Sequence, residues 1–197
     1  MKSLSLCIDI DGTVTEPYYW LERANAYFGS SLLPEHVTQY EIHKLLGVEP
    51  EVYLDFYEHN GIYLHSEAEI RLGAREVISS LYDNHIIHFV TAREEKMTDV
   101  SVQWLNRHQI PMDSITHLGS HHKVEKAVEL QADLFIEDSL ENALELAASG
   151  FHVLLIDCTY NKGLLPHNVL RVSNWFQIER FIDVRARQIA GNLKFAI

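Results

Sequence analysis

The chain has 197 residues, of which 47% are hydrophobic and 22% charged, and its formal net charge is −12 with a pI near 5.4. This length allows one well-packed core with room for an inserted subdomain. The acidic balance argues against a nucleic-acid polymer or an anionic membrane surface as the main partner, because both bind basic surfaces. A small phosphorylated ligand stays compatible with it, since a metal ion can supply positive charge locally.

The cysteines and the start of the chain bear on its compartment. Cys7 lies within the first predicted strand and Cys158 follows a later one, so we expect both thiols to be reduced and Cys7 to pack in the core. Residues 1–3 are too few to form the charged region of a signal peptide. No apolar run approaches the ~20 residues that span a bilayer. These features predict a soluble cytoplasmic protein.

The first predicted strand, Leu4–Ile10, is continuously apolar, as a parallel sheet covered on both faces requires. Three helical segments follow with no strand between them, and Pro or Gly residues mark several of their ends. They are expected at residues 18–28, 34–46 and 50–61. This interruption predicts an inserted subdomain, the helical insert (residues 16–71), with residues 1–15 and 72–197 forming the core.

Strand–helix alternation resumes after the helical insert. The expected strands are 86–90, 115–118, 134–136, 153–156 and 170–172, and the expected helices are 74–82, 95–108, one from Lys123 to about 130, 140–149 and 175–189. Such repeats predict an α/β fold with a Rossmann-like, doubly wound parallel sheet and right-handed crossovers. The sequence leaves open whether the last helix packs on the core or on a second subunit, so a homodimer remains compatible with it.

Polar side chains follow several of these strands. They are Asp9 and Asp11 after the first, Thr91 after the second, Lys123 after the third, and Glu137 and Asp138 after the fourth. In a parallel sheet these positions converge on one edge. Carboxylates gathered there repel one another unless a cation joins them, and an all-oxygen set without Cys or His suits Mg²⁺. A hydroxyl and an ammonium nearby suit the oxygens of a phosphate.

This ordered set resembles the four motifs of the haloacid dehalogenase-like (HAD) phosphatase superfamily, with Asp9-Ile10-Asp11-Gly12-Thr13 as the first. The helical insert resembles the C1-type cap of that superfamily, and residues 73–76 resemble the segment that re-enters the core. Within the superfamily, the chain looks most like the 5′(3′)-deoxyribonucleotidases and their bacterial nucleotidase relatives. The resemblance implies a HAD-like core and a phosphomonoester hydrolase that acts on nucleoside monophosphates.

The resemblance also implies a role for each motif residue. Asp9 is the expected nucleophile, which forms an aspartyl-phosphate, and Asp11 the expected general acid and base. Mg²⁺ is expected to be held by the Asp9 carboxylate, the Asp11 backbone carbonyl and the Asp138 carboxylate. Thr91 and Lys123 are expected to bind the phosphoryl oxygens.

The last motif departs slightly from the superfamily pattern, because Glu137 stands where many relatives have Asp. Glu137 is expected to support the metal site from outside the ligand shell, and direct ligation stays open.

Substrate contacts beyond the phosphate are less fixed by the sequence. Tyr18, Tyr19 and Trp20 follow the first motif and are placed to stack on a nucleobase. Arg93 lies two residues after Thr91, so it can reach a phosphate or a base, or instead pair with a neighbouring glutamate at the surface. We single out Tyr18, Tyr19 and Arg93 as candidate substrate-binding residues.

Several other residues have competing interpretations. Taken alone, Thr91 is typical of a helix cap, and Lys126 is a rival to Lys123 that fits a solvated surface better. Helical spacing places Tyr53, Phe56 and Tyr57 in the core of the insert. His121 and His122 fit either substrate contacts or the surface of a loop. No H-E-x-x-H or C-x-x-C pattern supports zinc.

Three rival functions remain. One keeps the mechanism and changes the substrate to a sugar phosphate or another small phosphomonoester, because the insert would determine specificity. A second is a receiver-type signalling module, against which the D-x-D pair and the long insert argue. A third is a phosphate-binding protein without turnover, which the intact Asp9 and Asp11 pair disfavours.

Overall fold

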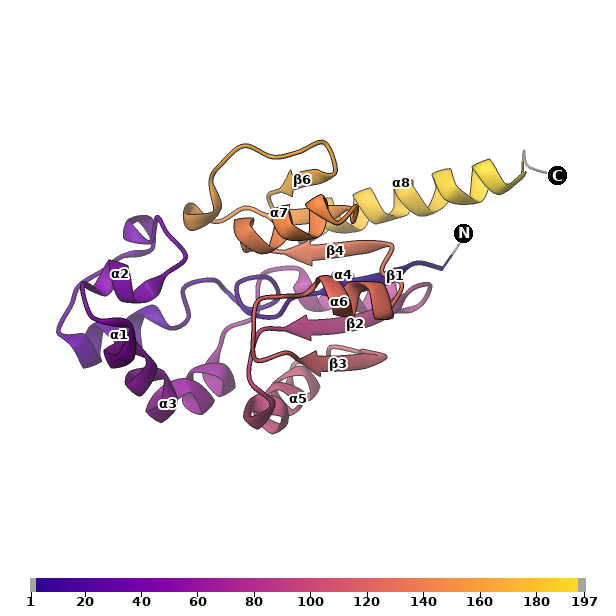
Figure 1. Cartoon of the computed structure of the whole chain (residues 1–197). Helices are drawn as coiled ribbons and strands as arrows, with labels where there is room; N and C mark the ends of the chain where they lie inside the picture. The colour runs from indigo at the N-terminus through magenta and orange to yellow at the C-terminus, as the bar shows by residue number, and fades with distance from the viewer. Residues whose placement is uncertain (1–2, 195–197) are drawn as a thin grey trace.

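The computed structural model describes residues 3–194, which form an α/β fold around a six-stranded sheet in the order β3–β2–β1–β4–β5–β6. Every neighbouring pair is parallel, and β1 lies in the middle between β2 and β4 (Figure 1). The strands are β1 (Ser5–Ile8), β2 (Ile86–Thr91), β3 (Ser114–His117), β4 (Leu134–Glu137), β5 (Val153–Ile156) and β6 (Val169–Val172). The predicted parallel sheet is therefore confirmed.

Helices cover both faces of the sheet. Successive side chains of a strand point to opposite faces, so Leu6 and Ile8 join one core cluster while Cys7 joins the other. Buried side chains of α4 (Ala74–Tyr82), α5 (Thr98–Arg107) and α8 (Trp175–Lys194) pack on the first face, and those of α6 (Val124–Glu129) and α7 (Leu140–Ala148) pack on the second. The sheet is doubly wound, as predicted.

The remaining α-helices and one 3₁₀ helix lie in the helical insert, beyond the carboxyl ends of the strands (Figure 1). They are α1 (Leu21–Phe28), the 3₁₀ helix η1 (Pro34–His36), α2 (Ile42–Leu46) and α3 (Pro50–Glu67). The insert has a small hydrophobic core of its own that includes Trp20, Val37 and Phe56. Its two connections to the sheet run side by side, with an antiparallel bridge between Thr15 and Ile70. The insert is therefore placed opposite the strand ends that carry the predicted motif residues.

The prediction of one helix over residues 34–46 is wrong. The chain forms only η1, then leaves the helical region at Val37 and stays extended at Glu41 before α2 begins. A tertiary contact accounts for the break, because the Val37 carbonyl accepts a hydrogen bond from the Thr159 hydroxyl instead of one within a helix. The resulting loop carries Tyr40 to the pocket described below.

Helix α3 continues six residues beyond its predicted end at Gly61. A β-carbon at Gly61 would lie 2.9 Å from the terminal carbon of Met97 on the short 3₁₀ helix η2 (Glu95–Met97). The glycine therefore permits a close approach between the insert and the core and does not end the helix. The chain leaves the helix at Ala68, whose carbonyl accepts a 2.8 Å hydrogen bond from the Trp104 indole.

The other predicted elements agree with the structure to within a few residues, apart from the C-terminal helix. That helix, α8, runs on to Lys194, and its buried residues Trp175, Ile178 and Ile182 pack on the core. Another 3₁₀ helix, η3 (Thr159–Asn161), follows β5. Within residues 3–194, no helix is long and apolar enough to cross a membrane.

Candidate active site

Asp9 and Lys123 form a buried ion pair at the carboxyl edge of the sheet. Asp9 follows β1, and its backbone N–H donates to the Ile136 carbonyl of β4 at 3.0 Å, which fixes its place between the central strands. The Lys123 ammonium donates to Asp9 Oδ1 and, at 2.6 Å, to Glu137 Oε1. Within the described part of the chain, no donor contacts Asp9 Oδ2, so one oxygen of this carboxylate stays available.

Glu137 is fully buried and its two oxygens accept four hydrogen bonds. Oε1 accepts from Lys123 and from the Asn142 amide at 2.9 Å, and Oε2 accepts from the backbone N–H groups of Asp138 and Ser139 at 3.0 Å each. Four donors fill the acceptor sites of a carboxylate. Glu137 therefore holds Lys123 and the loop after β4 in place.

Asp138 lies beside Asp9 and is held by two hydroxyl groups. Thr13 donates to Oδ1 at 3.2 Å and Tyr160 donates to Oδ2 at 2.6 Å. Oxygens of Asp9, Glu137 and Asp138 all lie within 4.8 Å of one another, and all three residues are buried. This donor set is entirely oxygen, which fits a hard divalent cation such as Mg²⁺.

The charges of this cluster are not balanced by the protein. Burial raises the pKa of Asp9 well above its usual range; Lys123 opposes the shift, while the neighbouring carboxylates add to it. Burial and then Glu137 raise the pKa of Asp138 to about 7. Lys123 contacts two of the three carboxylates, and Lys123 and Arg71 act on Asp138 only electrostatically, so a divalent cation would relieve the repulsion among the carboxylates.

Gly12 allows the loop after Asp11 to pass close to Asp138. Its φ is +74°, in the left-handed region, and a β-carbon there would lie 2.6 Å from the Tyr160 hydroxyl and closer still to Asp138 Oδ2. Only glycine combines this conformation with this space.

We expect Gly12→Ala to lower the free energy of unfolding by about 2 kcal/mol or more, because left-handed strain adds to the clash with Asp138. The clash should also displace the Asp138 carboxylate, so we expect weaker binding of added Mg²⁺. Denaturant unfolding and metal titration measure the two effects. Gly29 also has a positive φ, but a β-carbon there would meet nothing within 4 Å, so Gly29→Ala should show the backbone strain without the metal effect.

Asp11 is clamped by Arg93. The guanidinium donates from Nε to Oδ2 at 2.8 Å and from Nη2 to Oδ1 at 2.6 Å, a bidentate pair, and Nη1 donates to the Ser101 hydroxyl at 2.8 Å. Burial raises the pKa of Asp11, but Arg93 and then His65 outweigh it and hold that pKa well below its usual range. Arg93 is only 4% exposed, so its predicted alternative as a surface partner of a neighbouring glutamate is wrong.

Thr91 ends β2 and is fully buried next to this clamp. Its hydroxyl oxygen accepts the backbone N–H of Arg93 at 3.2 Å, and among residues 3–194 the hydroxyl donates to no acceptor, so its proton can be donated to a ligand. Lys126, the rival of Lys123, instead pairs with Glu129 on the surface, as expected.

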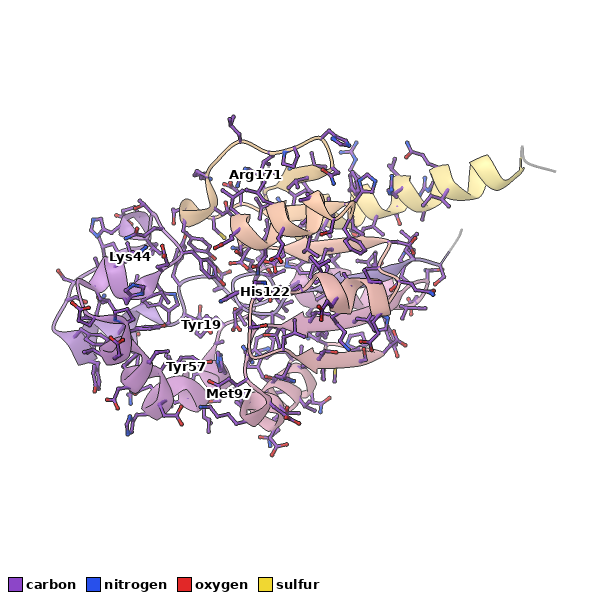
Figure 2. All side chains as sticks on the ribbon, viewed as in Figure 1. Tyr19, Lys44, Tyr57, Met97, His122 and Arg171 are labelled. Carbon is purple, nitrogen blue, oxygen red and sulfur yellow. The ribbon has the colours of Figure 1, made fainter. Side chains whose placement is uncertain are left out.

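A pocket of about 460 Å³ opens between the helical insert and these strand ends. Asp11, Arg93 and Asp138 line it from the core, and Figure 2 shows Tyr19 and Tyr57 on the side of the insert that faces the sheet. Six aromatic residues contribute to its wall: Tyr19, Trp20, Tyr40, Tyr53, Tyr57 and Tyr160. The structure therefore places Asp11 and Asp138 in the wall of an aromatic pocket, and the buried Asp9 lies next to Asp138 behind that wall.

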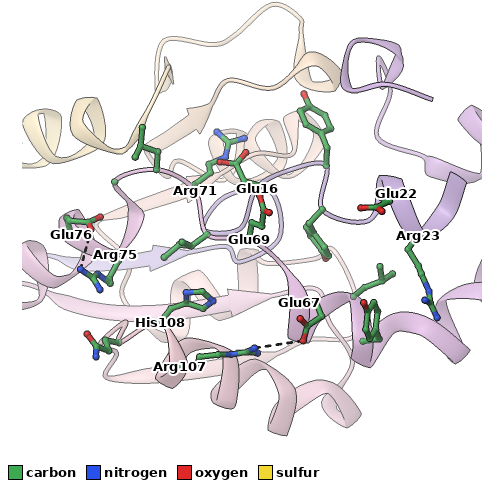
Figure 3. Close-up of a pocket in the computed structure, with 18 of the residues that line it drawn as sticks. Glu16, Glu22, Arg23, Glu67, Glu69, Arg71, Arg75, Glu76, Arg107 and His108 are labelled. Carbon is green, nitrogen blue, oxygen red and sulfur yellow. Dashed lines mark ion pairs between the residues drawn. The ribbon is translucent and has the colours of Figure 1, made fainter. Parts of the chain in front are cut away.

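A larger pocket of about 1120 Å³ lies along the connections of the insert (Figure 3). It is not this site, because none of Asp11, Arg93 and Asp138, which line the aromatic pocket, lines it. Its wall carries glutamates and arginines, some of which pair with each other, as Arg75 does with Glu76. Tyr18 lines this larger pocket and not the aromatic one, and its hydroxyl contacts Thr159 at 2.8 Å. Tyr19 lines both pockets.

Sequence reasoning did not single out His65, Tyr40 or Tyr160. His65 is a buried residue of α3 and Tyr40 belongs to the loop after η1, and neither carries a motif. Tyr160 follows β5 closely, so the rule that ligands gather after strand ends could have indicated it.

Solved structures of low sequence identity share this fold. The haloacid dehalogenase-like hydrolase SP0104 from Streptococcus pneumoniae superposes with a TM-score of 0.66 at 14% identity, covering 91% of this chain and 98% of its own. The HAD-hydrolase YfnB from Bacillus subtilis, solved with bound magnesium, superposes with a TM-score of 0.62 at 14% identity, covering 93% and 100%. The fold is therefore that of the HAD-like class.

Sequence comparison narrows the class to a family. A nucleotidase from Clostridium acetobutylicum is 47% identical over 183 residues, which are 93% of this chain and 95% of that protein. Residues 2–189 match the family described as 5′ nucleotidase, deoxy (pyrimidine), cytosolic type C protein, and the chain belongs to this family. It is a phosphoric monoester hydrolase, as the sequence predicted.

Proposed function

We propose that the protein is a Mg²⁺-dependent nucleotidase that hydrolyses nucleoside monophosphates through an aspartyl-phosphate on Asp9. The observation that carries the proposal is the buried Asp9–Lys123 pair, which adjoins Asp138 in the wall of the aromatic pocket. Membership of the nucleotidase family supports the reaction class.

In the first half of the reaction, Asp9 Oδ2 attacks phosphorus and the bond to the leaving oxygen breaks. The ammonium of Lys123 and the free hydroxyl proton of Thr91 offset the negative charge of the phosphoryl oxygens. Asp11, once protonated, gives its proton to the leaving oxygen, so that the nucleoside departs as a neutral alcohol.

In the second half, Asp11 accepts a proton from water while the water oxygen attacks phosphorus. The bond between phosphorus and Asp9 breaks, phosphate is released, and the Asp9 carboxylate is restored. Asp11 thereby recovers the proton that it donated, and the cycle closes.

The residues of the acidic cluster fit a magnesium ion. We propose that the Asp9 and Asp138 carboxylates and the Asp11 backbone carbonyl would hold it, while Glu137, whose oxygens already accept four hydrogen bonds, supports the site from outside. The magnesium found in the structural relative YfnB supports this choice of metal. When bound, the ion would neutralise charge between the nucleophile and the phosphate.

The charges of the aromatic pocket favour a neutral leaving group. Arg93 is the one lysine or arginine among its lining residues, and its guanidinium is taken up by Asp11 and Ser101. Glu41 and Glu94 add negative charge to the wall. A second phosphate or a carboxylate on the substrate would therefore be repelled, whereas a nucleoside can stack on the tyrosines.

We further propose that the helical insert, residues 16–71, acts as a cap that closes over the leaving group and excludes water, and that residues 1–15 and 72–197 are the catalytic core. The cytoplasm fits as the compartment, because Cys7 and Cys158 are free thiols in the structure. Tyr19 and Arg93 remain the proposed residues nearest the leaving group, while Tyr18 lines the other pocket.

A phosphate-release screen tests this function. We expect turnover of ribo- or deoxyribonucleoside monophosphates with Mg²⁺, loss of at least about 100-fold in rate after chelation, and recovery when Mg²⁺ returns. Nucleoside diphosphates should be poor substrates. Preference for sugar phosphates would overturn the substrate assignment, full activity with a chelator would overturn the metal, and inertness towards nucleotides and an aryl phosphate would overturn the class.

A further inference from the structure

The Asp11 carboxylate is held unequally at its two oxygens. Oδ1 accepts from Arg93 Nη2 at 2.6 Å and from the Tyr19 hydroxyl at 2.8 Å, and His65 Nδ1 lies 3.5 Å away. In the described residues, Oδ2 has one donor, Arg93 Nε at 2.8 Å. Oδ2 therefore keeps capacity for a further proton, while Oδ1 is crowded by groups from the insert.

His65 is fixed at both ring nitrogens. It is 2% exposed, its Nδ1 lies 3.1 Å from the Tyr19 hydroxyl, and its Nε2 lies 2.7 Å from the Tyr57 hydroxyl. The ring cannot rotate without losing one of these hydrogen bonds, which are costly to leave unmade in a buried site. Two tyrosines that line the aromatic pocket thus hold the imidazole against Asp11.

The helix that carries His65 is itself seated on the core. On either side of His65, Gly61 packs against Met97 of η2 and the Ala68 carbonyl accepts from the Trp104 indole of α5. Arg93 is anchored by Ser101 of the same core helix, α5. Asp11 therefore lies between a rigid arginine from the core and a rigid histidine from the insert.

We propose that His65 is a positioning residue for Asp11: with Tyr19 and Tyr57 it holds Oδ1, so that Oδ2 is the oxygen that exchanges the proton with the leaving group. The inference rests on the proposed role of Asp11. Through His65, the seating of the helical insert decides whether the acid is aligned.

The leaving group provides a test that a purely structural role would not pass. The leaving group of an aryl phosphate is a stable phenolate, which needs little help from a general acid. The leaving group of a nucleoside 5′-monophosphate is an alkoxide unless it is protonated, so its departure depends on the acid. Loss of alignment should therefore affect the nucleotide more than the aryl phosphate. The ratio kcat/KM is the quantity to compare, because it reports on the steps up to leaving-group departure.

We would measure kcat/KM of His65→Gln and Tyr57→Phe with p-nitrophenyl phosphate and with a nucleoside 5′-monophosphate. Both variants should lose about tenfold or more on the nucleotide and less than about threefold on the aryl phosphate. Tyr57→Phe removes only one hydroxyl, so it remains informative if His65→Gln folds poorly. His59→Gln is the matched control, because His59 is an exposed histidine of the same helix, and it should leave both ratios unchanged.

Equal losses on both substrates, or no loss on either, would overturn the proposal for His65 while leaving the proposed function intact. A wild-type protein that hydrolyses the aryl phosphate but no nucleotide would overturn only the substrate assignment, and a sugar phosphate then replaces the nucleotide in the same comparison. A wild-type protein inert towards all three would overturn the proposed function and the role of His65 with it.

Discussion

Replacing Asp9 with asparagine is expected to lower kcat for phosphate release by about 10⁴-fold or more, because an amide has almost the same shape as the carboxylate but is a poor nucleophile. The fold should persist, since Lys123 keeps its second partner, Glu137. A continuous phosphate assay measures the loss. Acid quenching of the wild type with labelled substrate should also trap phosphate on the protein, and the variant should trap none.

Asp157 offers a matched control for this substitution. It directly follows β5 as Asp9 follows β1, but it is partly exposed and pairs with Lys162 and Arg171 outside the aromatic pocket. Asp157→Asn should therefore retain close to wild-type kcat. Normal turnover by Asp9→Asn would remove Asp9 as the nucleophile, whatever the control shows.

Replacing Lys123 with methionine should cost both stability and activity. The side chain is 1% exposed, and its loss leaves Asp9 and Glu137 buried without their shared cation. Breaking a buried ion pair from one side costs about 3–5 kcal/mol in the free energy of unfolding. Turnover should be lost as well, because the ammonium no longer offsets the charge between nucleophile and phosphate.

Denaturant unfolding of Lys123→Met with and without Mg²⁺ tests whether its lost stability comes from the missing positive charge. Magnesium should restore more stability to the variant than to the wild type, since the metal then supplies the missing positive charge. Lys126→Met, three residues along the chain on a partly exposed pair with Glu129, should change stability by less than about 1 kcal/mol. A Lys123→Met protein as stable as the wild type would contradict the charge balance inferred for the cluster.

The sheet could be predicted from the sequence because its signals are local. Each buried strand is a short apolar run, and the helices between them carry a regular apolar face, so the predicted bounds of β5 and α4 match the structure to the residue. Long-range contacts account for the two errors in the insert. The Thr159 hydroxyl takes the Val37 carbonyl, and Met97 packs closely on Gly61, and neither contact has a signature near the residue that it affects.

In the candidate site, too, the residues with local sequence signals could be predicted and those placed by long-range contacts could not. Asp9, Thr91, Lys123 and Asp138 could be singled out because strand ends in a parallel sheet meet at one edge. Tyr19 and Arg93, which line the pocket, could be singled out as well, but His65 and Tyr40 could not, since they reach the site only through the way the insert packs on the core. A buried histidine in the middle of a helix looks like any other core residue until its partners are known.

The contact between Trp175 and Thr13 has a consequence for the order in which the protein matures. The fully buried indole at the start of α8 donates a 3.0 Å hydrogen bond to the carbonyl of Thr13, in the loop that follows the nucleophile. During synthesis, β1 leaves the ribosome early but must wait for β4, its neighbour in the sheet, and then for α8. A nascent chain lacking α8 would therefore leave the loop after Asp9 and Asp11 without the indole that holds it, and we expect hydrolysis to require that the last helix has docked.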